Sequence, residues 1–292
     1  MKTILAKKIT LIVFFLMIFC AAAINNLAVT ELDISYVTDG NTKQKLDLFL
    51  PDTKNFATVL LIHGGSLVEG DRKDEPFPQI CAAFQKSGIG CAVMSYRLGP
   101  ENKWAAQPED VSAAFAWLKQ NIVKRGGDDK KLFVLGHSSG ALLTALLGTD
   151  EKYLKLHNLT LKDIAGCIPI GSLLTNTFNF ENLSKERLDT IFKNNSYLSI
   201  FGSLETLNDS IPINHVNKDM PPFLILVAEA ERLQPPILAS AEEFAAAAQK
   251  VGAKVEIEVL KDRTHYATIN KMVETNDPTL LRIIQFIKAQ RA

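Results

Sequence analysis

The sequence predicts an α/β fold, in which a mostly parallel, doubly wound sheet carries helices on both faces. Two observations support this prediction. Continuous apolar runs of strand length recur along the chain, as at residues 57–62, 132–135 and 221–228, and such runs are typical of strands that are buried on both faces of a sheet. Helical patterns separate these runs, so that strands and helices alternate.

The first elements are expected to form an antiparallel hairpin at a sheet edge, from residues 30–37 and 45–50. Apolar and polar residues partly alternate in the second run, as in a half-exposed strand. The sequence Thr-Asp-Gly-Asn at 38–41 favours a turn between the two runs, and Pro51 ends the hairpin.

Glycines then mark where the helices end. Gly88 follows the first helix, Gly126 the second, and Gly252 caps a later helix that is rich in alanine. Buried strands are expected at 57–62, 91–95, 132–135 and 221–228, a further strand at 164–170 and a strand of alternating pattern at 254–260. Helices are expected at 75–86, from 108, and at 141–147, 236–251 and 278–290.

The composition is that of an ordinary globular protein. The chain has 292 residues, of which 47% are hydrophobic and 22% charged, enough for one large domain with a substantial core. Lys+Arg and Asp+Glu balance at 32 each, so the charge indicates neither nucleic acid nor an anionic membrane as a partner. The sequence leaves the oligomeric state open.

Residues 1–23 have the pattern of a secretory signal peptide. Lysines precede an apolar run, from residue 9 to 23, that ends in small residues. The run is shorter than the roughly 20 residues that a membrane span needs. We expect cleavage after Ala23, a secreted or periplasmic protein and no stable membrane span after cleavage, with an uncleaved anchor as the alternative.

Residues 24–292 are expected to form one domain. Within it, residues 171–220 are polar, rich in asparagine and irregular in pattern, which predicts a cap or lid inserted between core strands. The mature chain would hold Cys81, Cys91 and Cys167. A bridge between the first two and three buried free thiols are both compatible with this spacing. Sequons that would carry glycans only in a glycosylating host occur at Asn158, Asn182, Asn194 and Asn208.

The strongest local pattern is Gly136-His-Ser-Ser-Gly140, between the apolar run 132–135 and the helical run 141–147. A strand that reverses this sharply into a helix strains the residue at its apex, Ser138, and leaves no room for a Cβ at the glycines. The serine hydroxyl is then presented above a helix N-terminus, which is the geometry of a nucleophile.

A serine nucleophile needs a base, and the base needs an acid that orients it. His265 follows the last predicted strand, and Glu231 and Glu229 follow the strand at 221–228, so that all reach the sheet edge where Ser138 lies. Glu231 is preferred because Glu229 follows the strand so closely, but both remain open. The other histidines, His63, His137, His157 and His215, are weaker candidates for the base.

Donors for an oxyanion are expected from the backbone. The amide of Ser139 follows the nucleophile, and Gly64 and Gly65 lie in the sequence His63-Gly-Gly-Ser66 after a buried strand. No zinc-type or EF-hand spacing and no glycine-rich phosphate loop occurs, so neither a metal nor another cofactor is expected.

With these motifs the chain, from about residue 30 to its end, resembles the α/β-hydrolase superfamily. More narrowly, it resembles the His-Gly-Gly serine esterases, the hormone-sensitive-lipase-like and carboxylesterase-like group that includes kynurenine formamidase and some feruloyl esterases. The resemblance rests on His63-Gly-Gly-Ser66, Gly70-Asp71, Ser95-Tyr-Arg-Leu98, Pro100-Glu101, Pro108-Glu-Asp110, Gly136-His-Ser-Ser-Gly140, Pro221-Pro-Phe-Leu-Ile-Leu226 and His265.

Three positions depart from the pattern of this group. Ser66 stands where the group often has a third glycine, Glu231 replaces the usual aspartate, and Thr264 replaces the glycine before the histidine. The resemblance implies a Ser138–Glu231–His265 triad that cleaves small-molecule carboxylic esters through an acyl-enzyme. An arylformamidase or other amide hydrolase with the same triad is the alternative, and a non-catalytic binding protein of the same fold is a further one.

Overall fold

The computed structural model describes residues 28–38, 40–176, 183–232 and 236–290. The expected signal peptide and the sequon at Asn182 lie outside these residues. None of the helices in the described ranges is long and apolar enough to cross a lipid bilayer.

The described strands form one sheet of eight, in the order β1-β2-β4-β3-β5-β6-β7-β8. β1 pairs antiparallel with β2, and β2 pairs antiparallel with β4, whereas all the other neighbours are parallel. The predicted edge hairpin and the mostly parallel sheet are therefore confirmed. The strands span Val29–Ser35 (β1), Lys45–Leu50 (β2), Phe56–Ile62 (β3), Gly90–Met94 (β4), Gly127–His137 (β5), Gly166–Ile170 (β6), Phe223–Ala228 (β7) and Val255–Leu260 (β8).

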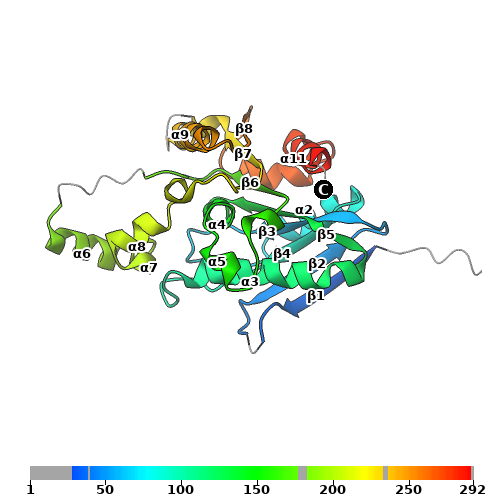
Figure 1. Cartoon of the computed structure of the whole chain (residues 1–292), viewed down its shortest axis with the longest axis horizontal. Coiled ribbons are helices and arrows are strands. Elements are labelled where there is room, and N and C mark those ends of the chain that lie inside the picture. The colour runs from blue at the N-terminus through cyan, green and yellow to red at the C-terminus, as the bar shows by residue number, and fades with distance from the viewer. Residues whose placement is uncertain (1–27, 39, 177–182, 233–235, 291–292) are drawn as a thin grey trace, which may run out of the picture.

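Helices cover both faces of this sheet (Figure 1). α3, α4 and α9 pack on one face, and α2 and α11 pack on the other. The helices span Phe77–Lys86 (α2), Ala106–Asn121 (α3), Ser139–Leu147 (α4), Lys152–Lys155 (α5), Ile237–Lys250 (α9), Ala267–Asn270 (α10) and Pro278–Ala289 (α11).

The central strand β3 shows why the sheet needs both layers. Leu60 and Ile62 point into the core under α3 and α4, and Val59 and Leu61 point into the core under α2. All four are fully buried, and burying a side chain of this size contributes about 1.5–3 kcal/mol each. Two buried faces explain the continuous apolar runs in the sequence.

Cys81 and Cys91 form a disulfide that joins α2 to β4. Of the two arrangements that the spacing allowed, the structure therefore contains the bridge. Cys167 is a free, fully buried thiol. Burial raises its pKa far above the ordinary range of a thiol, so that it stays protonated.

The segment between β6 and β7 contains short helices that lie beyond the end of the strands (Figure 1, left). It falls within residues 171–220, where the irregular pattern predicts a cap, and we refer to it as the cap segment. Its described helical elements are α6 (Lys185–Asn194), α7 (Leu198–Phe201), α8 (Leu204–Asp209) and the 3-10 turn Pro212–His215.

Candidate active site

Ser138 lies at the turn between β5 and α4, with a strained backbone of positive φ (φ 56°, ψ −122°). Two glycines make this turn possible. A Cβ on Gly136 would lie 2.1 Å from the carbonyl oxygen of Gly140, and a Cβ on Gly140 would lie 2.3 Å from that of Ile62. Any side chain at either glycine would therefore force the turn apart, as the sequence pattern predicts.

The start of α4 provides a polar environment below the serine. Ser139 is the first residue of this helix, and the first amides of a helix have no acceptor within it. The amide of Ser138 itself donates to the carbonyl oxygen of Ile170 at 2.9 Å, which ties the turn to β6. The amide of Ser139 and the helix dipole favour negative charge at this point.

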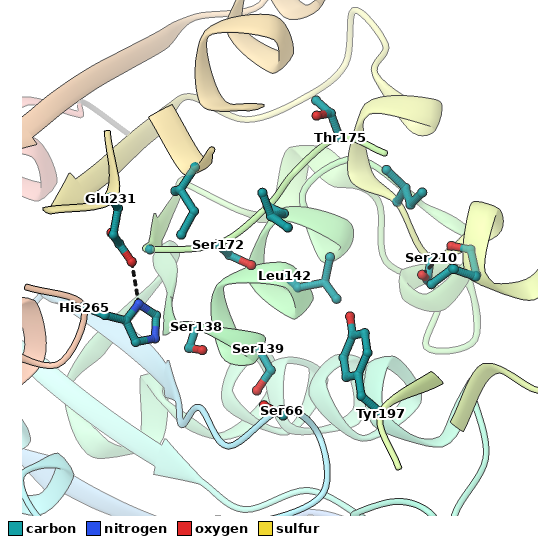
Figure 2. Close-up of a pocket in the computed structure, with 15 residues that line it drawn as sticks. Ser66, Ser138, Ser139, Leu142, Ser172, Thr175, Tyr197, Ser210, Glu231 and His265 are labelled. Carbon is teal, nitrogen blue, oxygen red and sulfur yellow. Dashed lines mark hydrogen bonds and ion pairs between the residues drawn. The ribbon is translucent and has the colours of Figure 1, made fainter. Parts of the chain in front are cut away.

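Glu231 and His265 form a close pair. Nδ1 of His265 lies 2.5 Å from Oε1 of Glu231, whose side chain is only 2% exposed. Its second oxygen, Oε2, accepts a bond from the amide of Ala228 at 2.9 Å. Figure 2 shows Ser138 beside the His265 ring, on the side away from Glu231. The three side chains that the sequence singles out therefore lie together.

The competing carboxylate, Glu229, lies elsewhere. It is exposed, and it accepts a bond from the amide of Asp262 at 3.0 Å. The 3-10 turn Glu229–Glu231 follows β7 directly and turns the two side chains in different directions. Of the two acids that the sequence leaves open, Glu231 is the one that contacts His265.

Gly171 lies against this pair, although sequence reasoning gave it no role. Its backbone is left-handed (φ +65°), and a Cβ there would lie 3.2 Å from Oε1 of Glu231 and 3.2 Å from Nδ1 of His265. A side chain would push the acid and the histidine apart. The available signal was a glycine directly after the buried strand β6.

The loop after β3 passes beside the nucleophile. A Cβ on Gly64 would lie 3.1 Å from the Cβ of Ser138, and a Cβ on Gly65 (φ +111°) would lie 2.2 Å from the carbonyl oxygen of Glu69. Ser66 and Leu67 also have left-handed backbones, at φ 52° and 63°. Glycine adopts a positive φ most easily, which explains why similar proteins often have a glycine where this chain has Ser66.

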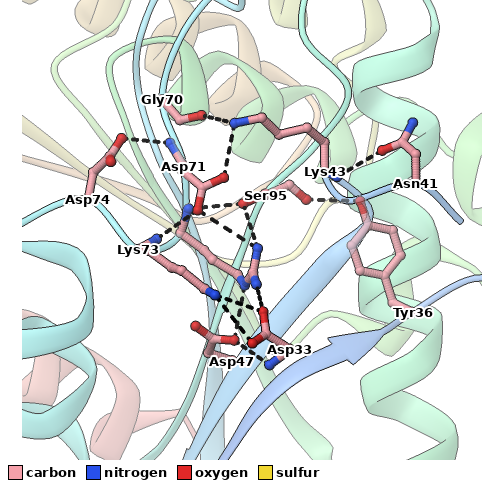
Figure 3. A network of polar contacts seen from close by, with 11 residues as sticks. Asp33, Tyr36, Asn41, Lys43, Asp47, Gly70, Asp71, Lys73, Asp74 and Ser95 are labelled. Atoms are coloured by element: carbon pink, nitrogen blue, oxygen red, sulfur yellow. Dashed lines mark hydrogen bonds and ion pairs between the residues drawn. The ribbon is translucent and has the colours of Figure 1, made fainter.

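A buried arginine, Arg72, holds the far end of this loop, and Figure 3 labels its partners Asp33, Asp47 and Ser95. Nε of Arg72 lies 3.0 Å from Oδ1 of Asp47, and the two side chains are 4% and 5% exposed. Nη2 of Arg72 also contacts Asp33, and the backbone amide of Arg72 donates to Oγ of Ser95 at 3.0 Å. The loop is thereby tied to β1, to β2 and to the segment after β4.

Lys43, between β1 and β2, adds a second tie. Its Nζ donates to the carbonyl oxygen of Gly70 at 3.0 Å and to Oδ2 of Asp71 at 2.9 Å (Figure 3). The edge hairpin thus supports the loop from outside, which no local pattern in the sequence indicates.

His63, at the start of the loop, is a structural residue. Its ring stacks on Tyr96 at a centroid distance of 4.3 Å, and its Nδ1 donates to the carbonyl oxygen of Gly64 at 2.7 Å. Burial lowers its pKa to about 4, so the ring is neutral near pH 7. His157 and His215 do not line the cavity at Ser138, whereas His265 does.

The cavity at Ser138 has a volume of about 420 Å³. Core residues form one side and the cap segment forms the other (Figure 2). Apart from the Glu231–His265 pair, no charged side chain of the described residues lines it. Its described lining consists of Ser66, Ser138, Ser139, Leu142, Gly171, Ser172, Leu173, Thr175, Tyr197, Leu207, Ser210, Ile211, Glu231, Ile237 and His265.

Asp150, Asp209 and His215 come close enough together for their ligand atoms to face a single point. The ammonium of Lys152 already lies there, 2.9 Å from Oδ2 of Asp150 and 2.5 Å from Oδ2 of Asp209. A metal ion would have to displace this lysine, so the group is better described as an ion-pair cluster that joins the cap segment to α5.

An eight-stranded, mostly parallel sheet with a strained serine at a strand-to-helix turn defines an α/β-hydrolase fold. The chain belongs to the BD-FAE family, whose model matches residues 46–242. It is 26% identical over 230 residues to the esterase LipQ of Mycobacterium tuberculosis, covering 76% of this chain and 53% of LipQ. It is 24% identical over 251 residues to the kynurenine formamidase of Danio rerio, covering 85% of this chain and 78% of the formamidase.

Solved structures agree on the fold. A truncated carbohydrate esterase from gut microbiota superposes with a TM-score of 0.72 at 19% identity, over 92% of this chain and 98% of that one. An esterase of the archaeon Pyrobaculum calidifontis gives a TM-score of 0.68 at 20% identity, over 89% of this chain and 84% of that one. The present chain spans about half the length of the first curated relatives that it matches, for example 53% of LipQ.

Proposed function

We propose that the protein hydrolyses carboxylic esters of small molecules, with Ser138 as the nucleophile. The observation that carries the proposal is the Glu231–His265 pair beside a serine on a strained turn, at the wall of a cavity. A buried carboxylate on Nδ1 leaves Nε2 of the imidazole available to take a proton. The similarity to proteins named as esterases supports the same reaction.

In the proposed mechanism, Nε2 of His265 accepts the proton of the Ser138 hydroxyl while Oγ forms a bond to the ester carbonyl carbon. The amides of Gly64, Gly65 and Ser139 stabilise the oxyanion, and Ser66, which lines the cavity, is a further donor. The imidazolium of His265 then protonates the leaving alkoxide. Water, deprotonated by His265, cleaves the acyl-enzyme and restores Ser138.

Glu231 stabilises the imidazolium and fixes the tautomer of His265. It is bound through both oxygens, to His265 and to the amide of Ala228, so it has little freedom to turn away. The glutamate reaches the histidine from a 3-10 turn directly after β7.

An amide hydrolase of the arylformamidase type is the second proposal. The similarity to a kynurenine formamidase, which covers 78% of that protein, favours it, and the same three side chains would act on a formamide carbonyl. A panel of nitrophenyl esters and aryl formamides, assayed side by side, distinguishes the two reactions by their kcat/KM values.

The test of the proposal is Ser138→Ala. We expect kcat for a short-chain nitrophenyl ester to fall at least about 10⁴-fold, and labelling by a fluorophosphonate to disappear. Ser87→Ala, at the C-cap of α2, is the matched control and should keep both. Unchanged turnover in Ser138→Ala would refute the proposed nucleophile, and an unlabelled, inactive wild type would favour a binding protein.

We further propose that the chain is exported and that residues 1–23 are removed. The disulfide between Cys81 and Cys91 supports this, because such bonds persist mainly in oxidising compartments. N-terminal sequencing of protein from the native host should begin at Ile24, and a chain that begins at Met1 would contradict the proposal.

A further inference from the structure

His137 directly precedes the proposed nucleophile, yet its side chain contacts the proposed base. Its ring centroid lies 4.5 Å from that of His265, and the residue is only 3% exposed. Nε2 of His137 lies 2.9 Å from the backbone carbonyl oxygen of His265. Because a carbonyl oxygen only accepts, Nε2 carries the proton and donates it.

The same carbonyl oxygen has a second donor. Oγ1 of Thr268, at the start of α10, donates to it at 2.6 Å. Thr268 is fully buried, so both donors are shielded from water. Two hydrogen bonds on one oxygen fix the peptide plane after His265 and therefore the direction in which its side chain leaves the backbone.

On its other side, His137 meets the loop after β3. A Cβ on Gly64 would lie 3.1 Å from the carbonyl oxygen of His137 and 3.4 Å from its Nδ1. His137 thus lies between the loop that holds the proposed oxyanion donors and the loop that holds His265. Any movement of the His137 ring would displace both the loop after β3 and the loop that holds His265.

We propose that His137 is a positioning residue for the hydrolysis, which holds His265 in line with Ser138 by donating a hydrogen bond to the His265 backbone. This inference rests on the proposed function. His265, and not His137, is the proposed base, because His265 is the ring whose Nδ1 is held by the buried carboxylate of Glu231. Glu231 fixes one end of the His265 ring, and His137 fixes the backbone from which that ring extends.

The charge of His137 is compatible with this role. Burial, and next the neighbouring His265, lower the pKa of His137 to about 4. The ring is therefore neutral near pH 7, where it supplies one N–H without placing a second positive charge beside the imidazolium that forms on His265.

Three substitutions test the hydrogen bond. His137→Gln places an amide N–H as many bonds from Cβ as Nε2 of histidine, whereas His137→Asn is too short and His137→Leu fills the space without a donor. For Leu and Asn we expect kcat to fall about 10–100-fold, because a small misplacement of a catalytic group has effects of this size. KM should stay within about twofold, since only the transition state uses the alignment.

His137→Gln should recover most of kcat. His157→Leu, at a histidine that does not line the cavity, is the matched control and should keep kcat. Equal kcat values for the Gln and Asn variants would overturn the proposal, and that comparison remains decisive if the Leu variant does not fold. A rise in KM without a fall in kcat would equally overturn it.

A second measurement does not depend on turnover. The proton between Nδ1 of His265 and Glu231 should give a low-field proton NMR signal in the wild type and in His137→Gln. That signal should be lost or broadened in His137→Leu and His137→Asn. An inactive wild type with this pattern would reject the proposed hydrolysis alone, whereas an unaltered signal in all variants would reject the role of His137.

Discussion

The two sides of the cavity are built differently. On the sheet side, the amide of Ser138 is bound to Ile170 of β6, and Glu231 is bound through its two oxygens to the amide of Ala228 in β7 and to His265. On the cap side, the described wall comes from residues on or beside short helical elements between β6 and β7, namely Tyr197, Leu207, Ser210 and Ile211. The groups that would carry out chemistry are thus joined to strands of the sheet, whereas the cap side of the wall is built from short helical elements outside the sheet.

This difference predicts how substitutions should act. Changes on the sheet side should affect kcat or the stability of the whole domain, because they disturb a buried and closely packed region. Changes on the cap side should affect the choice of substrate and leave kcat and the stability of the domain largely intact. The same separation explains how one framework can carry many substrate preferences.

The largest expected effect after loss of the proposed nucleophile is at the proposed acid, Glu231. Glu231→Gln should lower kcat about 10³–10⁴-fold, because the amide can no longer stabilise the imidazolium of His265. Glu229→Gln, two residues away and exposed, should stay within about twofold. Steady-state kinetics on one ester decide the matter, and a larger loss in the Glu229 variant would reverse the assignment.

The buried arginine provides the next test. Arg72→Met should destabilise the protein by about 3 kcal/mol, because Asp47 would keep a buried charge without its partner. Lys73→Met is the control, since the Lys73 side chain is 56% exposed, and it should change stability by less than about 0.5 kcal/mol. Urea unfolding gives both values, and equal values would show that the network does not support the fold.

Acid should weaken the sheet side through its buried histidines. His63 and His137 have folded-state pKa values of about 4, below the ordinary value of about 6.5. The unfolded chain therefore binds protons more readily between these values. The contribution of these two histidines to the free energy of unfolding should be constant above about pH 6.5. It should fall toward pH 4, by up to about 1.4 kcal/mol per pH unit for each histidine.

Unfolding experiments at several pH values measure this slope. His137→Gln removes one of the two groups and should make the slope between pH 6.5 and pH 4 shallower by up to about 1.4 kcal/mol per pH unit, whatever its effect at pH 7. An unchanged slope would mean that His137 is not neutral in the folded protein.

The smallest effect is expected on the cap side. Ile211→Val removes one methylene from the cavity wall and should shift the ratio of kcat/KM between two acyl lengths by roughly tenfold or less. Ile213→Val removes the same group at a position that does not line the cavity and should leave the ratio unchanged. Equal shifts in both variants would show that the cap side does not select substrates in this way.

Local patterns were sufficient to predict the sheet and the serine turn. The buried strands show as apolar runs because both faces of the sheet are covered. A side chain at Gly136 would collide with the backbone of Gly140 in the same turn, and one at Gly140 would collide with Ile62 on the neighbouring strand β3. The edge hairpin followed from alternation along Lys45–Leu50. Apart from the contact of Gly140 with Ile62, these features depend on neighbours in sequence, and so a single sequence contains them.

The supports of the site depend on distant partners. His137 meets His265 across 128 positions of the chain, and Arg72 meets Asp47 across 25, so no periodicity indicates either contact. The choice between Glu229 and Glu231 depends on a 3-10 turn that redirects the chain within two residues. In the cap segment, Ser184 and Ser203 do accept N-cap bonds at α6 and α8, a local signal that could have located these helices.

The bridge between Cys81 and Cys91 has a practical consequence for anyone who produces this protein. Both cysteines are fully buried, so an oxidant cannot reach them once α2 has packed onto β4. The bond must therefore form while the chain is still assembling. Recombinant expression in a reducing cytosol should yield the dithiol form, whereas a host that folds the chain under oxidising conditions should yield the bridged protein directly.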